Sequence, residues 1–394
     1  MKKPRVLVVS SNPPMNEMGG CLLFYRKFVE RDDYTFAVVT NRSDYPGHGE
    51  PWLLVREPAW LQRLSRTRLA NLAHDYRHAF LGHRIPSEVK SFARGFAPDV
   101  IIMGAHNWMG DLGLALGRYL RVPVAGHFMD WASYAALGHN WMIHHLSSIY
   151  RRRYRQCDLA FGICPEMLQR LGPHPNTEVF YPSGKALDPP PTPRTRDEHQ
   201  PFTLFFGGNL GQWYGQALAE LSQLLRSEPG LALRVAGKNP SWSAAANERM
   251  SREGEFLGYL DKSAYRTEME RTDALLVIMG FDEDSRIVES TSFKSKLVDY
   301  LQLGRPVIVW GPDYCTAVRH AEREGFAAIV TEPDPREVVR VLRKLADEPA
   351  QAREIVEAGR RFFNEYLDAD KVMGRARASI ERLLEMPKPE RERQ

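Results

Sequence analysis

The sequence predicts an α/β protein with two tandem domains, each built around a parallel sheet. Its 394 residues, 43% hydrophobic and 26% charged, are more than one simple hydrophobic core accommodates. Short apolar runs alternate with amphipathic segments of helical length through both halves of the chain, as in doubly wound sheets. Near the middle, a proline-rich and charged segment interrupts the alternation and predicts a domain boundary.

Five apolar runs in the first half predict parallel strands, with helical segments between most of them. In the first run only Val6 to Val9 are continuously apolar, which is too short for a secretory signal and typical of a strand. No stretch approaches the roughly 18 apolar residues that a membrane span requires. The predicted strands are RVLVVS (5–10), TFAVVT (35–40), DVIIMG (99–104), VPVAGHF (122–128) and LAFGI (159–163).

The segment YPSGKALDPPPTPRTRDEHQP (181–201) predicts the interdomain linker. After it the alternation of strands and helices restarts, so we expect Rossmann-like domains at residues 1–190 and 195–368. The periodicity that follows predicts a C-terminal helix at 370–386. The strands expected in the second domain are FTLFFGG (202–208), ALRVAG (232–237), EFLGYL (255–260), ALLVIMG (274–280), PVIVWG (306–311) and AAIVTE (327–332).

The four cysteines lie far apart and form no CxxC pair, so the sequence suggests neither a zinc site nor a disulfide framework. A reducing cytoplasm is therefore the expected compartment. Ligands of open α/β sheets bind beyond the carboxyl ends of the strands, so we expect the two domains to face each other across a cleft that holds the site.

Positive charge is concentrated in the first half. Residues 1–192 contain 23 Lys/Arg against 16 Asp/Glu, and the remainder contains 30 against 33. In the segment 60–84, Trp60 and several leucines alternate with arginines, which predicts a helix that lies on an anionic membrane surface. The alternative is that the leucines pack on the sheet and the arginines face water. The basic residues concerned are Arg63, Arg66 and Arg68, with a second cluster at Arg151, Arg152, Arg153 and Arg155.

The stretch ESTSFKSKLVDYLQLGRPVIVWGP (289–312) carries the most informative charges. It predicts a helix with Ser292 as N-cap, an apolar stripe through Leu297 and Leu301, and an end at Gly304. Lys294 and Lys296 then fall in the first turn, where the backbone also favours anions, so a phosphate is expected there. Asp299, one turn on, is placed to accept hydrogen bonds from ribose hydroxyls. A surface Lys-Asp pair of little energetic weight is the alternative.

Within this stretch, SKLVDYLQLGRPVI resembles the donor-site signature of family 4 GT-B glycosyltransferases, S-K-x-x-E-Y-x-x-x-G-K-P-V-I. The resemblance implies that Ser295 and Lys296 bind the donor and that Asp299 binds its ribose. The commonest family pattern also has a glutamate eight residues before the ribose carboxylate, where this chain has Thr291. Glu289, ten residues before Asp299, is the nearest acid, and whether it takes over that role is an open question.

A second stretch, FFGGNLGQWYGQALAEL (205–221), follows the first strand of the second domain. Glycines there allow a pyrophosphate close to the backbone, although a tight turn would explain them equally well. The stretch resembles the loop that opens the donor domain in this family, where many relatives carry basic residues. The donor-binding candidates in this part of the chain are Gly207, Gly208, Asn209, Gly211 and Lys238.

In the first domain, SSNPPMNEMGG (10–20) resembles the family's glycine loop, which contacts acceptor and donor diphosphate and here includes Gly19 and Gly20. His127 and Asp130 end a predicted strand at the position where related enzymes hold the acceptor hydroxyl. His106 and Asn107, at another strand end, are weaker candidates for the same site.

The resemblance implies a hexosyltransferase that moves a sugar from a UDP- or GDP-linked donor to a glycan or lipid-linked acceptor, in surface polysaccharide or glycolipid synthesis. It also implies retention of configuration without a metal or other cofactor, with Lys296, His127 and Asp130 as catalytic residues, and a C-terminal helix that crosses back to the first domain. A peripheral membrane location is expected, and a nucleic-acid partner is not. The alternatives are a nucleotide-sugar epimerase of the same fold and a noncatalytic nucleotide-sugar binding protein.

Overall fold

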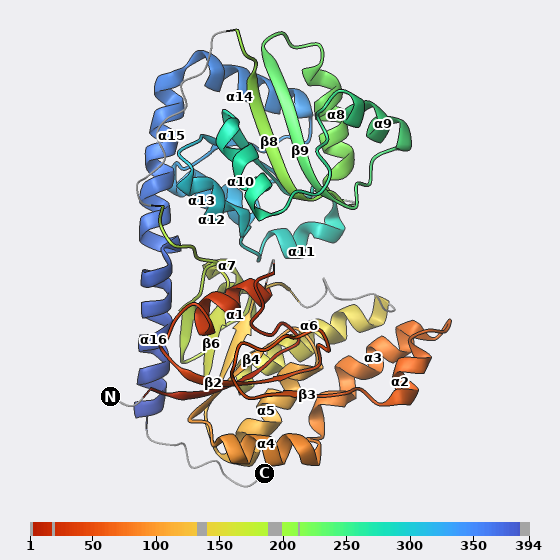
Figure 1. Cartoon of the computed structure of the whole chain (residues 1–394), viewed down its shortest axis with the longest axis vertical. Helices are drawn as coiled ribbons and strands as arrows, with labels where there is room; N and C mark the ends of the chain where they lie inside the picture. The colour runs from red at the N-terminus through yellow and green to blue at the C-terminus, as the bar shows by residue number, and fades with distance from the viewer. Residues whose placement is uncertain (1–2, 18–19, 132–139, 188–198, 212, 387–394) are drawn as a thin grey trace. The chain divides into compact units, whose positions relative to one another are not determined.

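The computed structural model describes residues 3–17, 20–131, 140–187, 199–211 and 213–386. The chain divides into two compact units, each with its own parallel sheet (Figure 1). Unit 1 comprises residues 1–181 together with 372–394, and unit 2 comprises residues 182–371.

Unit 1 contains a seven-stranded sheet in the part of the chain that the structure describes, with strand order β3-β2-β1-β4-β5-β6-β7. Every neighbouring pair is parallel. Its central strands are buried on both faces, which explains their continuous apolar runs. The strands are β1 Arg5–Val9, β2 Thr35–Thr40, β3 Trp52–Leu54, β4 Val100–Gly104, β5 Val124–Phe128, β6 Leu159–Gly162 and β7 Thr177–Val179.

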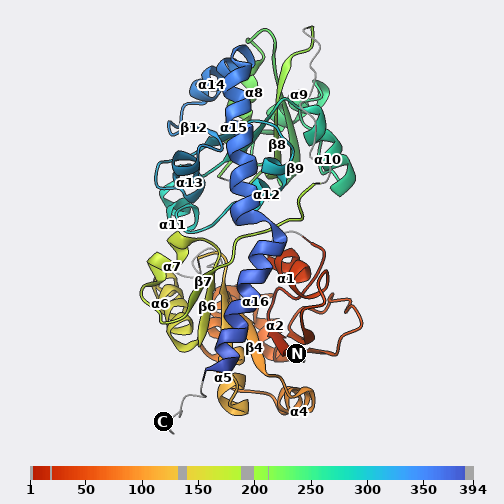
Figure 2. The same cartoon turned by 90° about the vertical axis from the view of Figure 1, so that its left-hand side faces the viewer.

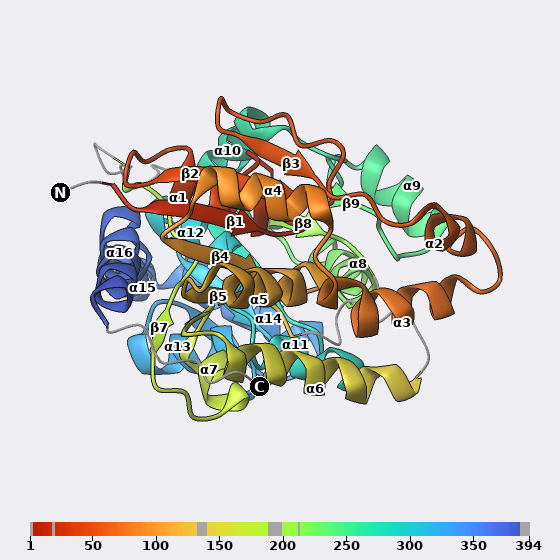
Figure 3. The same cartoon turned by 90° about the horizontal axis from the view of Figure 1, so that it is seen from below.

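Helices cover the unit 1 sheet, and α5 packs most tightly on it (Figure 3). The side chain of Asn107 caps α5 by accepting a hydrogen bond from the Met109 N–H at 2.9 Å. A Cβ at Gly113 would lie 2.8 Å from that of Met103 on β4, so the glycine allows the close approach. The helices are α1 Gly20–Phe28, α2 Ala59–Leu64, α3 Ala70–Phe80, α4 Ser87–Phe96, α5 Trp108–Leu120, α6 Asn140–Gln156 and α7 Pro165–Leu171, with a 3₁₀ turn at Leu81–His83.

The C-terminal helix α16, Ala369–Glu385, packs against unit 1 for most of its length (Figure 2). Its buried stripe includes Ala376 and Ile380, both fully buried. On its flank, the Ser379 hydroxyl donates to Glu178 at 2.9 Å. Arg377 forms an ion pair with Asp33 at 3.3 Å. The helix therefore completes the core of a unit whose other elements all precede residue 182.

Unit 2 contains five parallel strands within the described residues, in the order β12-β11-β10-β8-β9. The strand predicted at 255–260 is wrong. The segment forms an isolated bridge between Phe256 and Val235 and backbone hydrogen bonds to β9 as far as Gly258, whose φ of +68° ends the pairing before a regular strand is formed. The strands are β8 Phe202–Asn209, β9 Leu231–Lys238, β10 Ala274–Ile278, β11 Val307–Trp310 and β12 Ala328–Val330.

The helices of unit 2 enclose a core of Leu, Val, Ile and Phe side chains from the sheet. Helices α8 and α14 lie side by side on one face (Figures 1 and 2). The helices are α8 Gly215–Leu225, α9 Ala244–Arg252, α10 Lys262–Arg271, α11 Arg286–Glu289, α12 Lys296–Gln302, α13 Thr316–Glu324, α14 Pro335–Asp347 and α15 Pro349–Phe362, with a π turn at Phe363–Leu367.

One lysine lies inside the unit 1 core. The Nζ atom of Lys27, on α1, is 3.3 Å from His127 Nε2 and lies over the rings of Phe161 and Phe180 at 4.3 and 4.6 Å. No carboxylate among the described residues forms an ion pair with it. Burial lowers the pKa of Lys27 from 10.5 to about 7. The rings offer the ammonium only partial compensation for its lost hydration.

We expect Lys27→Met to stabilise the protein at pH 7 and to do so less as the pH rises toward 10. Between the folded and unfolded pKa values the unfolded chain binds more protons, so the destabilisation by Lys27 is largest below pH 7 and fades above it. Thermal melting at several pH values checks this, with Lys3→Met, at an exposed lysine of the same unit, as control. A Lys27→Met variant with the same change in Tm at every pH would contradict the assignment.

Candidate functional site

The strand order of unit 2 reverses between β8 and β10. From β8 the chain crosses to β9 on one side of the sheet and then returns to β10 on the other. Such a switch point opens a crevice beyond the carboxyl ends of the two strands, because their following segments leave in opposite directions. Gly207 and Gly208 lie at this end of β8, and Gly280 follows β10. The glycine and lysine motifs of the sequence therefore meet at one place.

The helix after this crevice begins later than predicted. Helix α12 starts at Lys296, and Ser292 is not its N-cap but a buried residue whose carbonyl accepts a hydrogen bond from Thr316. The predicted burial of Leu297 and Leu301 is confirmed, and Gly304 ends the segment with φ of +64°. With seven residues the helix has a weak dipole, so side-chain charge must supply most of the attraction for an anion.

Two tyrosines fix the backbone of Gly207. The Tyr300 hydroxyl accepts a hydrogen bond from the Gly207 N–H at 3.2 Å, and the Tyr265 hydroxyl donates to the Gly207 carbonyl at 3.4 Å. A Cβ at position 207 would collide with the Tyr265 ring. Burial, followed by the effects of Tyr300 and Asp299, raises the pKa of Tyr265, so this hydroxyl remains a donor. Close packing against Tyr265 is therefore enough to require a glycine at this position.

Lys296 is the cation nearest to the β8 glycines. Its Nζ lies 3.9 Å from the centre of the Phe206 ring and 3.0 Å from the place that a Cβ of Gly208 would occupy. Gly208 has φ of +149°, a conformation that side chains rarely adopt. No described carboxylate forms an ion pair with Lys296. Burial, and then the charge of Lys294, lowers the pKa of Lys296 to about 7.

Lys294 has a very different environment from Lys296. Its Nζ lies 2.6 Å from Glu289 Oε2 and 3.0 Å from the Tyr214 hydroxyl. Although burial alone would lower the pKa of Lys294, the Glu289 carboxylate raises it above its ordinary value. Oε1 of the fully buried Glu289 accepts hydrogen bonds from the Tyr214 hydroxyl at 2.7 Å and from the Gly280 N–H at 3.1 Å. Lys294 thus holds a structural carboxylate in place.

Thr291, at the position of the family's glutamate, is also buried, and its hydroxyl donates to the Ile287 carbonyl at 2.6 Å. Its side chain is engaged in the turn before α12. In this structure Glu289 is committed to Lys294 and Tyr214, so neither residue presents a carboxylate to the crevice.

The other donor-binding candidates lie around the same strand ends. Asn209 pairs in register with Lys238, and both are exposed at the carboxyl ends of β8 and β9. The Nζ of Lys238 lies over the Tyr259 ring at 3.9 Å. Ser295 and Asp299 are exposed immediately before and within the first turn of α12. Gly211 donates its N–H to the Asn209 side chain at 3.2 Å, which closes the loop after β8.

Unit 1 has its own switch point, between β1 and β4. At this end of the sheet the Asn107 amide donates to the Ser11 hydroxyl, which links the ends of the two strands. The Asp130 N–H, just beyond β5, donates to His106 Nε2 at 2.9 Å. Burial lowers the pKa of His106, which suits this neutral, accepting imidazole. The half-exposed Asp130 carboxylate lies 3.9 Å from the same nitrogen.

His127 does not lie with Asp130. It is buried on the face of β5 that packs against α1, with its ring stacked on Phe161 at 4.7 Å and its Nε2 near Lys27. Of the predicted glycine loop, Gly19 is outside the described residues. Gly20 begins α1, where a Cβ would lie 2.8 Å from the Met129 sulfur. The backbone of Gly20 therefore packs closely against Met129, in the segment after β5.

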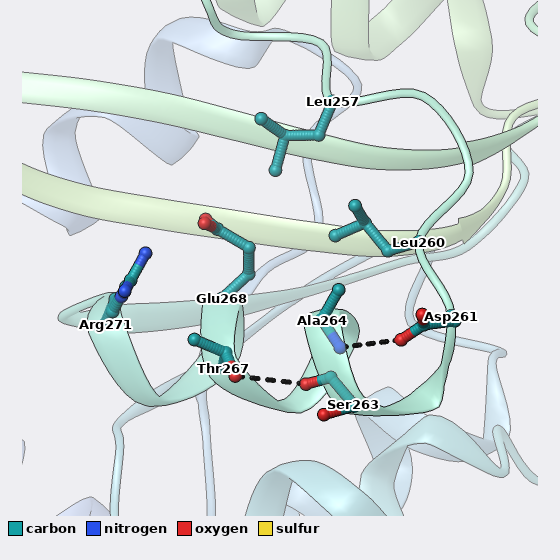
Figure 4. Close-up of a pocket in the computed structure, with 8 residues that line it drawn as sticks. All are labelled: Leu257, Leu260, Asp261, Ser263, Ala264, Thr267, Glu268 and Arg271. Atoms are coloured by element: carbon teal, nitrogen blue, oxygen red, sulfur yellow. Dashed lines mark hydrogen bonds between the residues drawn. The ribbon is translucent and has the colours of Figure 1, made fainter.

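Some of these contacts had no local signal in the sequence. Tyr214, Tyr265 and Tyr300 hold the site together, yet Tyr265 lies outside both stretches that the sequence assigned to the donor site. The hollow in Figure 4, between the segment before α10 and the helix itself, has no comparable chemistry. There Asp261 caps the helix by accepting from the Ala264 N–H at 2.8 Å, and Glu268 pairs with Arg234. Both carboxylates of the hollow are therefore engaged by other groups of the protein.

The fold is shared with several solved structures. Anabaena Alr3699/HepE in complex with UDP matches with a TM-score of 0.66 and 13% identity, over 96% of this chain and 100% of its own. Sucrose-phosphate synthase from Thermosynechococcus elongatus matches with a TM-score of 0.65 and 12% identity, over 97% and 99%. A Listeria monocytogenes protein provisionally assigned as a UDP-N-acetylglucosamine 2-epimerase matches with a TM-score of 0.54 and 13% identity, over 99% of each chain.

These likenesses confirm the predicted fold class, two α/β domains of the GT-B type. At such low identity they establish the fold, and function has to be argued from the site. No protein-family model matches the sequence, and no curated protein matches it either. Among the described residues, no three His, Cys, Asp or Glu side chains are grouped so as to hold a metal ion.

We expect Glu289→Gln to destabilise unit 2 by about 3–5 kcal/mol, because the mostly buried Lys294 would lose its countercharge. Adding Lys294→Met should restore much of the loss, since the double variant buries no charge. Urea denaturation provides the measurement. Glu283→Gln, which breaks an exposed pair with Arg286, should cost no more than about 1 kcal/mol. If Glu289→Gln cost no more than this control, Glu289 would not have the structural role described here.

Proposed function

We propose that this protein is a glycosyltransferase that takes its sugar from a nucleotide-linked donor bound by unit 2. The proposal rests mainly on one observation. At the switch point of the unit 2 sheet, Lys296 has no carboxylate partner among the described residues and lies beside Gly208 and over the Phe206 ring. A desolvated cation beside the partly exposed backbone of Gly208 suits an anion with several oxygens, such as a diphosphate.

The neighbours support this choice of donor. Alr3699/HepE was solved with UDP, with UDP-glucose, and with UDP and glucose. In our proposal the diphosphate lies along Gly207 and Gly208, with Lys296 and Lys238 as its cations. The ribose then lies against Asp299 in the first turn of α12. The donor base is uridine or guanosine, and membership of family 4 stays a prediction.

Lys296 would act on the leaving group. When the bond between the sugar and the diphosphate breaks, the diphosphate gains negative charge, and a nearby ammonium stabilises that charge most in the transition state. Glu289 and Lys294 would act indirectly, by fixing the loop that leads into α12. We propose that the reaction is of the hexosyl type, retains the anomeric configuration and needs no metal.

The acceptor would bind unit 1. Asp130 has a half-exposed carboxylate at a strand end, held beside His106, and is the side chain best placed to orient a hydroxyl group there. His127 would support this region from within the core. We propose a glycan or lipid-linked acceptor from surface polysaccharide or glycolipid synthesis, and action on the cytoplasmic side of a membrane. The described residues include no helix long and apolar enough to cross a bilayer.

A nucleotide-sugar epimerase of the same fold is the second candidate, and the Listeria neighbour is the observation that favours it. Its TM-score is lower than those of Alr3699/HepE and sucrose-phosphate synthase. A screen of UDP- and GDP-sugars with analysis of both products separates the candidates. Release of nucleoside diphosphate with a glycosylated acceptor supports transfer, an altered sugar supports epimerisation, and binding without turnover supports a noncatalytic protein.

We expect Asp299→Ala to weaken nucleoside diphosphate binding by about 1–3 kcal/mol, because the ribose would lose a charged acceptor. Asp299 is exposed, so the fold should be unaffected. Titration calorimetry measures the affinity, and Asp347→Ala, at an exposed aspartate at the end of α14, serves as control. Equal affinity of the folded Asp299 variant and the control would remove this residue from the site.

Lys296→Met should lower kcat more than it raises the donor KM, since the charge is needed most in the transition state. Binding should also involve proton uptake. In the free protein the pKa of about 7 leaves Lys296 mostly neutral at pH 8, and a bound diphosphate would raise that pKa.

Calorimetry of nucleoside diphosphate binding at pH 8, in buffers of different ionisation enthalpy, measures this proton. We expect uptake approaching one proton for the wild type and for Lys262→Met, at an exposed lysine of α10, and none for Lys296→Met. A wild type that binds without proton uptake would show that Lys296 does not meet the diphosphate.

A further inference from the structure

Helix α3 of unit 1 has its amphipathic faces reversed. Its buried residues are Ala73, Asp75 and His78, whereas Leu72, Tyr76 and Phe80 point to solvent. The side chains of Leu72 and Phe80 are 51% and 62% exposed. A helix that packs on a globular core normally shows the opposite pattern. The exposed apolar face of α3 therefore indicates an interaction site for a partner outside the unit.

The polar inner face explains the orientation. Helix α3 lies against α5 and α6, which bury an ion pair between Asp111 and Arg153 at 2.6 Å. Burial lowers the pKa of His78 to about 3, so this ring stays neutral above the pair. Rotating α3 to bury its leucine and aromatic residues would expose these polar groups and place apolar side chains over two charges. The core thus forces the apolar face outward.

The exposed apolar side chains form a continuous surface with α2. The Trp60 ring lies 5.1 Å from Tyr76, and Tyr76 lies 5.4 Å from Phe80. Leu69, 47% exposed, leads into α3. In Figures 1 and 3 the two helices lie at the outer edge of the unit, away from its sheet. We call these five residues, Trp60, Leu69, Leu72, Tyr76 and Phe80, the α2–α3 surface.

The charges beside this surface are positive. Arg63, Arg66 and Arg68 are exposed in α2 and the following loop, and no ion pair with a described residue involves them. The two acidic residues of the region, Glu57 and Asp75, do not pair with these arginines. Glu57 pairs with Arg77 at 2.7 Å, and Asp75 is buried. A second copy of the chain would bring the same cations together, so charge disfavours self-association through this face.

We propose that the α2–α3 surface, with Arg63, Arg66 and Arg68, docks on a lipid bilayer that contains anionic headgroups. Exposed Trp and Tyr rings suit the boundary between headgroups and acyl chains, leucine and phenylalanine enter the apolar layer, and arginines meet lipid phosphates. The proposal goes beyond sugar transfer. It concerns the membrane surface at which the protein acts. Its test is independent of whether the protein is a glycosyltransferase.

Sedimentation of the full chain with vesicles tests the proposal without any donor or acceptor. Wild type should bind phosphatidylcholine vesicles that contain phosphatidylglycerol, release at high salt, and bind pure phosphatidylcholine far less. The variant L72S/F80S should lose about tenfold or more in affinity. Its control, Met386→Ser, changes an exposed apolar residue elsewhere and should bind as wild type does.

A second pair of variants tests the charges. R63Q/R66Q/R68Q should lose the preference for phosphatidylglycerol, whereas R252Q/R336Q/R340Q removes the same charge from exposed arginines of unit 2 and should keep it. All the changed side chains are exposed, so unaltered melting temperatures should accompany every variant.

Three results of the vesicle experiments would overturn the proposal. They are absence of binding to anionic vesicles at low salt, equal binding by L72S/F80S and wild type, and equal loss in the two arginine triples. A wild type that forms dimers, which L72S/F80S disrupts without any effect of lipid, would show that a second copy covers the surface.

Discussion

The site of unit 2 depends on one buried carboxylate. Glu289 has no exposed surface, and its charge is tolerated because Lys294, Tyr214 and the Gly280 N–H all meet it. These contacts join the end of β10, the segment before α8 and the segment before α12. Lys296 follows Lys294 by two residues, so its position beside the β8 glycines is a consequence of the same pair. A seven-residue helix without these contacts would not fix the position of the Lys296 side chain.

Two lysines so close in sequence illustrate how environment sets charge. Both lose hydration, but Lys294 gains a carboxylate at 2.6 Å while Lys296 gains only the face of Phe206 and the repulsion of its neighbour. Their pKa values therefore move in opposite directions.

Lys27 in unit 1 is a second desolvated lysine without a carboxylate partner among the described residues. It lies deep among aromatic rings, so burial alone does not identify a ligand site, and proximity to a switch point has to accompany it.

The sequence predicted the architecture because strands buried on both faces leave continuous apolar runs. Most of these runs became strands. One run is an exception, because Gly258 ends the pairing that EFLGYL would otherwise extend. Two strands, β3 and β7, were not predicted, because they are three-residue edge strands with partly exposed side chains. The grouping of Lys296 with Gly208 was also predictable, since Gly208 lies at the carboxyl end of β8 and the segment with Lys296 follows β10. The partnership of Tyr214 with Lys294 was not, because it spans 80 residues of sequence. Nor was the inward orientation of His127, which depends on the face of β5 that meets α1.

The path of the chain has a consequence for biosynthesis. Unit 2 is continuous, whereas unit 1 is interrupted by it and needs α16 to cover its core. During translation Ala376 and Ile380, which complete the core of unit 1, are made only after every residue of unit 2. Unit 2 can therefore fold to completion before unit 1, although it comes later in the sequence. Until α16 is made, unit 1 exposes an apolar surface that chaperones can bind and that can lead to aggregation.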